Sequence, residues 1–202
     1  MKAILHLNSS IFGQAGQSSR LAQEFVAQFP EARVVTRDLG TNALPHLDAE
    51  RFAAFLAKPE SRTPTQQAVI NESDALIAEL RQADTLVLGL PMYNFGVPSQ
   101  LKAYFDHVAR AGVTFKYTEN GAVGLLTGKK AYVFAARGGL YRGTPRDTQT
   151  GYVREFLAFL GITDIEFVYA EGLAIGEASK KESLARAQRS LRSLAQPETI
   201  AA

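Results

Sequence analysis

Residues 85–90 read TLVLGL, an almost continuous apolar run that ends at Pro91. A short run of this kind, rich in branched side chains, predicts a strand that is covered on both faces, as central strands of parallel sheets are. Four other runs along the chain have a similar character. The sequence therefore predicts five strands, at residues 3–7, 33–38, 85–90, 131–136 and 165–170.

Amphipathic stretches separate these runs, and their apolar residues recur at the three- and four-residue spacing of a helix. Strands that alternate with helices predict an α/β fold with a doubly wound parallel sheet of order 2-1-3-4-5. The predicted apolar faces are Leu21, Phe25, Val26 and Phe29; Val69, Ser73, Leu76 and Leu80; Leu101, Tyr104, Phe105 and Val108; and Leu184, Ala187, Leu191 and Leu194.

The length of 202 residues, of which 46% are hydrophobic and 21% charged, fits one domain over residues 1–202 with a substantial core. Residues 41–63 and 112–130 exceed what a minimal unit of this fold needs, so we interpret them as functional or interfacial insertions. The tail from Gln196 onward is predicted to fray.

Composition excludes several classes of protein. The chain has no cysteine, which removes disulfides, thiolate metal sites and cysteine nucleophiles. His6, His46 and His107 lack the spacing of metal ligands, so no metal site is expected. A net charge of +2 without a basic stripe argues against nucleic-acid binding. No apolar run is long enough to cross a membrane and no signal peptide is recognisable, so we expect a cytoplasmic protein.

The loop after the first predicted strand is rich in small and hydroxyl-bearing residues and leads directly into a helix. The free amides and partial positive charge of that helix end favour an anion, and Ser10, Ser18 and Ser19 add hydroxyl donors. The alternative is that these serines only cap the helix. A dinucleotide fingerprint is absent, which favours a mononucleotide.

Two further loops at the same predicted edge of the sheet carry unusual residues. Residues 91–98 read PMYNFGVP, and their aromatic side chains suit contact with a flat conjugated ring, while Asn94 can bond its polar edge. The alternative is a loop folded back into the core. Residues 135–141 read AARGGLY, where the amides of Gly138 and Gly139 are candidate oxyanion donors or, alternatively, part of a tight turn.

With PMYNF at residues 91–95, RGG at 137–139, ARAGVTFKYTENG at 109–121 and FLGIT at 159–163, the sequence closely resembles the bacterial FMN-dependent NADH azoreductases, also described as NADH:quinone oxidoreductases. The resemblance covers the whole chain. It implies a flavodoxin-like fold, bound FMN, NADH or NADPH as cosubstrate, quinones and azo dyes as acceptors, and a homodimer with active sites at the subunit interface.

The resemblance also implies roles for particular residues. Ser10, Gly16, Gln17 and Ser18 would hold the FMN phosphate, and Met92, Tyr93, Asn94 and Phe95 would line the ribityl chain and ring. Ala136, Arg137, Gly138 and Gly139 would meet the pyrimidine edge, and Tyr117, Phe115 and Phe159 would wall the acceptor pocket. Members of the family often have serine at the positions of Gly16 and Ala136. Core packing is the alternative for Phe115 and Phe159.

The expected reaction is a ping-pong cycle in which NADH delivers hydride to the flavin N5 and an aromatic acceptor then takes the same place. No catalytic side chain is predicted, because FMN does the electron chemistry and the protein positions the reactants. Two other functions remain open: a flavodoxin-type electron carrier, although such carriers are typically acidic, and an interaction domain that has kept the fold without its cofactor.

Overall fold

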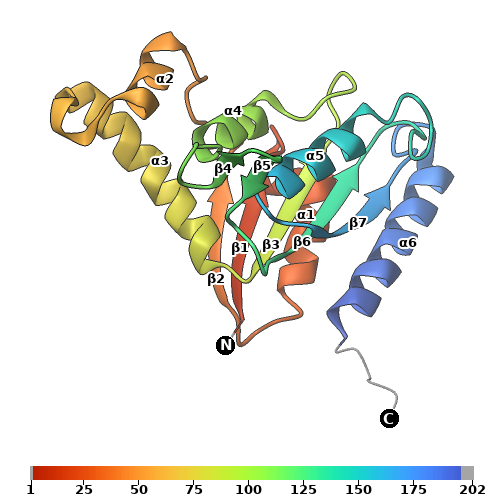
Figure 1. Cartoon of the computed structure of the whole chain (residues 1–202). Coiled ribbons are helices and arrows are strands. Elements are labelled where there is room, and N and C mark those ends of the chain that lie inside the picture. Colours follow the sequence, from red (N-terminus) through yellow and green to blue (C-terminus); the bar gives the residue numbers. More distant parts are fainter. Residues whose placement is uncertain (1, 197–202) are drawn as a thin grey trace.

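The computed structural model describes residues 2–196 and contains a five-stranded parallel sheet of order β2-β1-β3-β6-β7 (Figure 1). This is the predicted 2-1-3-4-5 order, and the predicted α/β fold is confirmed. Of the predicted tail, residues 197–202 lie outside the described part of the chain. The strands of the sheet are β1 (Ala3–Asn8), β2 (Arg33–Asp38), β3 (Thr85–Pro91), β6 (Lys130–Ala136) and β7 (Asp164–Ala170).

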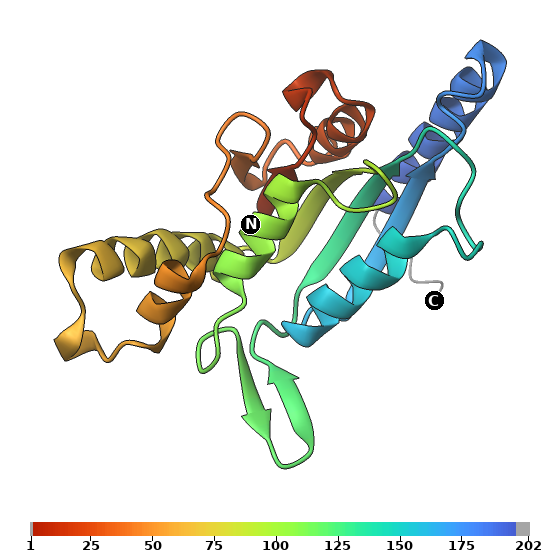
Figure 2. The same ribbon diagram turned by 90° about the horizontal axis from the view of Figure 1, so that it is seen from above.

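Helices cover both faces of the sheet, so the molecule has three layers (Figures 1 and 2). On one face α1 (Gln17–Val26) and α6 (Glu177–Ala195) bury their apolar residues against the sheet. On the other face lie α3 (Pro64–Gln82), α4 (Ser99–Val108) and α5 (Thr148–Phe159). β3 is buried along its whole length, as its apolar sequence predicts.

Helix α1 is shorter than the apolar pattern indicates. It ends at Val26, so the predicted extension of its apolar face to Phe29 is wrong. The reason lies in Pro30, because the residue before a proline is disfavoured in the helical region. Phe29 still packs edge-on against Phe25, with ring centroids 5.2 Å apart, but from the turn that follows the helix.

Both predicted insertions contain regular structure. Residues 41–63 include α2 (Ala49–Leu56) and the short 3-10 helix η2 (Pro59–Ser61). Helix α2 packs on α3, and α2 and the N-terminal part of α3 lie beyond the edge of the sheet (Figure 1). Residues 112–130 include a hairpin of β4 (Phe115–Thr118) and β5 (Gly121–Gly124), which turns at Glu119 and Asn120.

The base of the hairpin touches the turn between α5 and β7, backbone against backbone. A Cβ atom on Gly124 would lie only 2.0 Å from the backbone nitrogen of Gly161. Gly161 itself has φ 100°, a conformation that glycine adopts without the steric cost that a side chain brings. The amide of Leu126 donates to the carbonyl of Leu160 at 2.8 Å beside this contact. The close approach therefore fixes where the hairpin leaves the body of the protein.

Candidate functional site

The carboxyl ends of β1, β3 and β6 share one edge of the sheet, and the loops that follow them contact one another there. Ser10, after β1, has its Oγ atom 3.2 Å from the hydroxyl of Tyr93, after β3. Phe95 in the same β3 loop packs edge-on against Tyr141, after β6, with ring centroids 5.5 Å apart. The structure thus brings the three predicted loops together at the edge where open α/β sheets bind ligands.

The first loop passes through a short 3-10 helix, η1 (Gly13–Ala15), and delivers the bare N-terminus of α1 to this edge. The N-cap of α1 is Gly16, and no side chain caps the helix, so the serines do not act as caps. Gln17 is the first helical residue and is partly exposed. Ser18 is fully buried, and its Oγ has no hydrogen-bond partner within residues 2–196. A free helix end beside an unpartnered hydroxyl is a ready site for an anion.

The second loop makes a tight turn whose tip is exposed to solvent. Tyr93 and Gly96 exchange two backbone hydrogen bonds, of 3.2 and 2.9 Å. The two residues between them, Asn94 (φ 49°) and Phe95 (φ 65°), both adopt the left-handed conformation that such two-residue turns require. Both are exposed, Phe95 by 48%, so the loop is not folded into the core. Met92 is half-buried, and its amide donates to the carbonyl of Ala136 at 3.1 Å.

Helix α5 holds this turn from behind. The hydroxyl of Thr148 donates to the carbonyl of Phe95. The side chain of Gln149 is fully buried, and its Nε2 donates to the carbonyls of Pro91 at 2.8 Å and Gly96 at 3.2 Å. The left-handed pair is therefore fixed by side chains from another element, which is what a strained loop needs to persist.

In the third loop, the side chain of Arg137 points into the protein and not toward the other two loops. It is fully buried and binds Glu171, Asp147 and Thr150 at 2.8 to 3.1 Å. Its own amide donates to the carbonyl of Ala170 at 2.9 Å. The side chain and amide of Arg137 are thus both used internally.

The two glycines of the third loop have free donors. Within residues 2–196 the amides of Gly138 and Gly139 have no hydrogen-bond partner. A Cβ atom on Gly139 would lie 2.6 Å from the ring of Tyr141, so a side chain at this position would require that ring to move. Ala136, the last residue of β6, is buried beneath the loop. The arrangement leaves two adjacent backbone N–H groups available near the turn of the second loop.

The structure does not bring the three predicted pocket aromatics to this edge of their own chain. Phe115 is buried and packs on Phe159 with ring centroids 4.3 Å apart, so core packing accounts for much of its contact. Tyr117 extends from the hairpin and is 75% exposed. Figure 2 shows the hairpin projecting on the side of α4 and α5, away from the loop after β1.

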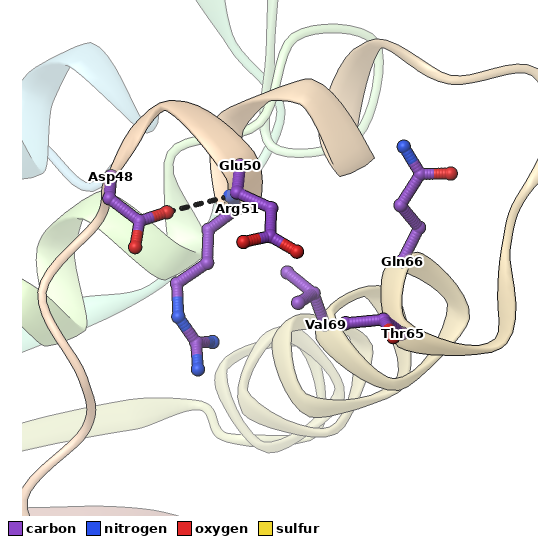
Figure 3. A pocket seen from close by; sticks show the side chains of 6 residues that line it. All are labelled: Asp48, Glu50, Arg51, Thr65, Gln66 and Val69. Atoms are coloured by element: carbon purple, nitrogen blue, oxygen red, sulfur yellow. Dashed lines mark hydrogen bonds between the residues drawn. The ribbon is translucent and has the colours of Figure 1, made fainter.

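Other cavities lie near the insertions. A groove of about 430 Å³ adjoins the second loop and is lined by His46, Gly96, Val97, Ser99, Lys102, Thr148 and Tyr152. A smaller cavity of about 170 Å³ lies between α2 and α3 (Figure 3), where Asp48 Oδ1 accepts the amide of Arg51 at 2.8 Å. Its lining comes from α2, α3 and the residues beside them, and includes none of the predicted site residues.

Two residues at the site escaped sequence reasoning. Tyr141 was visible as an aromatic two positions after the glycine pair, and Glu171 as a carboxylate directly after the last apolar strand.

Within residues 2–196, no group of three or more histidine or acidic side chains is arranged to hold a metal ion. In the same range, none of the helices has the length and apolar character to span a bilayer.

Comparisons with known proteins agree with this geometry. Residues 2–195 match the family described as flavodoxin-like fold. An FMN-dependent NADH:quinone oxidoreductase of Cellvibrio japonicus (strain Ueda107) is 54% identical over 195 residues, covering 95% of this chain and 97% of the relative. A protein of the same name, numbered 6, from Burkholderia lata is 52% identical with coverage of 95% and 98%.

Solved structures lead to the same family. The azoreductase from Bacillus anthracis str. Sterne superimposes with a TM-score of 0.88 at 27% identity, covering 96% of this chain and 99% of that one. An FMN-dependent NADH-azoreductase from Bacillus anthracis str. Ames Ancestor, solved in complex with FMN, gives 0.85 at 26% identity, covering 97% and 100%. The chain therefore belongs to the flavodoxin-like fold family and, within it, to the FMN-dependent NADH:quinone oxidoreductases.

Proposed function

We propose that this protein binds FMN at the junction of the three loops, takes reducing equivalents from NADH or NADPH, and passes them to quinones and aromatic azo compounds. The observation that carries the proposal is the convergence of the loops, through Ser10 with Tyr93 and Phe95 with Tyr141, beside the uncapped N-terminus of α1. The names of the relatives supply the chemistry: FMN, NADH, quinone and azo reduction.

The residues of the first loop fit the phosphate of FMN. The N-terminal amides of α1 have no side-chain cap, and Ser18 offers a buried hydroxyl without a protein partner. A buried hydroxyl left unbonded is unfavourable, so a phosphate oxygen that accepts from it would satisfy the group. We assign Ser10, Gly16, Gln17 and Ser18 to this end of the cofactor.

The second and third loops fit the ring system. FMN, when bound, supplies the hydride chemistry, and the protein supplies orientation and electrostatics. Met92, Tyr93 and Phe95 present apolar surface to a flat ring, and the side chain of Asn94 makes no hydrogen bond to the protein within the described residues. The unpaired amides of Gly138 and Gly139 offer fixed donors where negative charge develops on reduction.

We propose that the acceptor pocket is completed by a second copy of the chain in a homodimer. Tyr117 is exposed on a hairpin that points away from its own loops, with Phe115 and Phe159 packed at its base. Aromatic side chains of this kind are enriched at protein–protein interfaces. Its ring would then wall the pocket of the partner.

The same open site would serve donor and acceptor in turn, which predicts ping-pong kinetics. We expect the protein to act in the cytoplasm. The test begins with a visible spectrum of the purified protein, before and after addition of FMN. Initial rates are then measured with NADH and NADPH against a quinone and an azo dye. Parallel double-reciprocal lines and a yellow protein are expected. A colourless protein that cannot be reconstituted would favour an interaction domain, and bound FMN without NADH consumption would favour an electron carrier.

A further inference from the structure

One carboxylate ties the third loop to the end of β7. Glu171 directly follows β7, and its Oε1 atom accepts three hydrogen bonds. The donors are the amide of Tyr141 at 3.0 Å, the amide of Arg142 at 2.9 Å and the guanidinium of Arg137 at 3.1 Å. The Glu171 side chain is only 12% exposed, so these bonds are made largely out of solvent. One oxygen atom thus joins both ends of the segment that holds the glycine pair.

The guanidinium carries this connection on to α5. Arg137 Nη2 binds Asp147 Oδ1 at 2.8 Å and Thr150 Oγ1 at 2.9 Å, and Asp147 is the N-cap of α5. Burial alone would raise the pKa of Asp147, but the hydrogen bonds from Arg137 and Thr150 keep that pKa below its ordinary value. A fully buried guanidinium bonded to two carboxylates and a hydroxyl has little freedom to move, because each bond that it lost would leave a buried polar atom unsatisfied.

The backbone of the glycine pair is held on its acceptor side only. The carbonyl of Gly138 accepts from the amide of Ala174 at 3.0 Å, and that of Gly139 from Gly172 at 2.9 Å. Their N–H groups, as described above, remain free. The segment therefore has fixed ends, fixed carbonyls and two available donors, which is the arrangement of a preorganised anion-stabilising turn.

We propose that Glu171 is a positioning residue for the flavin site. By binding the Tyr141 and Arg142 amides together with the Arg137 guanidinium, it holds the Gly138 and Gly139 amides in place to donate to the pyrimidine edge of FMN. The inference rests on the proposed function. The Glu171 side chain reaches the glycine pair only through the Arg137 guanidinium and the backbone amides of Tyr141 and Arg142.

The test titrates apo-protein with FMN and with riboflavin, which lacks the phosphate. Glu171→Gln removes the charge. Glu171→Asp keeps the charge beside Arg137, which protects folding, but shortens the reach of the carboxylate. Both variants should bind FMN and riboflavin about tenfold more weakly, by the same factor, as loss of about one charge-assisted hydrogen bond predicts. Ser18→Ala, at the phosphate end, should weaken FMN but not riboflavin. Glu79→Gln is the matched control, since it disrupts the half-buried Arg37 pair on another part of the fold.

A spectroscopic measurement separates positioning from simple stability. The C2=O stretch of bound FMN should move to higher frequency in both Glu171 variants, because its hydrogen bonds weaken, and should not move in Glu79→Gln. Riboflavin affinity or a C2=O stretch equal to that of the wild type in both Glu171 variants would overturn the positioning role while leaving the proposed function intact. Wild-type protein that binds neither flavin would overturn both.

Discussion

A Cβ atom on Gly16 would lie 2.3 Å from the Oγ of Ser10, because the Ser10 side chain occupies the space beside Gly16. That Oγ also lies 3.2 Å from the hydroxyl of Tyr93 and accepts the amide of Phe12 at 3.2 Å. The absence of a side chain at position 16 is thus part of the contact between the first two loops.

Gly16→Ser should therefore displace Ser10 and disrupt its contact with Tyr93. We expect a loss of about 1 to 3 kcal/mol in the free energy of unfolding, as for other overpacked positions, together with weaker FMN binding. Denaturant unfolding of the apo-protein and FMN titration measure the two effects. The double variant Ser10→Gly/Gly16→Ser should recover most of the stability. A single variant as stable as the wild type would show that the space is easily vacated.

Replacing Asn94 should weaken FMN binding or slow flavin reduction. Asn94→Ala also lowers the free energy of unfolding by about 1 kcal/mol, because alanine tolerates the left-handed region less well than asparagine does. Asn94→Gly removes the amide side chain without that strain. If the side chain binds the flavin, both variants lose affinity in a fluorescence titration. Wild-type affinity and reduction rate in Asn94→Gly would refute the assigned role.

Asp147 should make stability depend on pH in the acid range. Its pKa is lower in the folded protein than in the unfolded chain, so the stabilisation is present above the unfolded value, about 4, and is lost as pH falls through the folded value. Asp147→Asn keeps a capping side chain but loses the charge opposite Arg137, and should cost about 2 to 3 kcal/mol at pH 7. The deficit should shrink below pH of about 4.

The control for this experiment is Asp48→Asn. Asp48 caps α2 by accepting the amide of Arg51 at 2.8 Å, at an exposed site, and asparagine caps a helix about equally well. Unfolding by denaturant at several pH values should show little change for this variant. Equal losses in the two variants would mean that capping, not the buried charge, determines the effect.

Tyr117→Ala should affect the acceptor rather than the fold. Because its side chain is exposed, we expect a change of less than about 0.5 kcal/mol in the free energy of unfolding and unchanged FMN affinity. The KM for a quinone should rise by up to about tenfold, the value of one aromatic contact. Phe115→Ala, by contrast, should destabilise the chain by about 3 kcal/mol. Steady-state kinetics in which Tyr117→Ala keeps the wild-type KM would argue against its place in the pocket.

Much of this architecture is predictable from sequence because it depends on local patterns. The strand at 85–90 is recognisable from its apolar run, and the three loops from their composition after predicted strands. The sequence pattern is misleading at the end of α1, because the apolar spacing continues to Phe29 while Pro30 prevents the helix from doing so. Glu171 could not be connected with Tyr141 by pattern, since 30 residues separate them and only the parallel pairing of β6 and β7 brings them together.

The contact of Gly124 with Gly161 limits which substitutions can be accepted at the base of the hairpin that carries Tyr117. Neither position tolerates even a methyl group without moving main chain, and a compensating exchange at the other is impossible, because glycine has nothing left to remove. Insertions or deletions at the tip around Asn120 meet no such obstacle. Homologues that retain both glycines should therefore share the direction of this hairpin, while the length of the hairpin can differ among them.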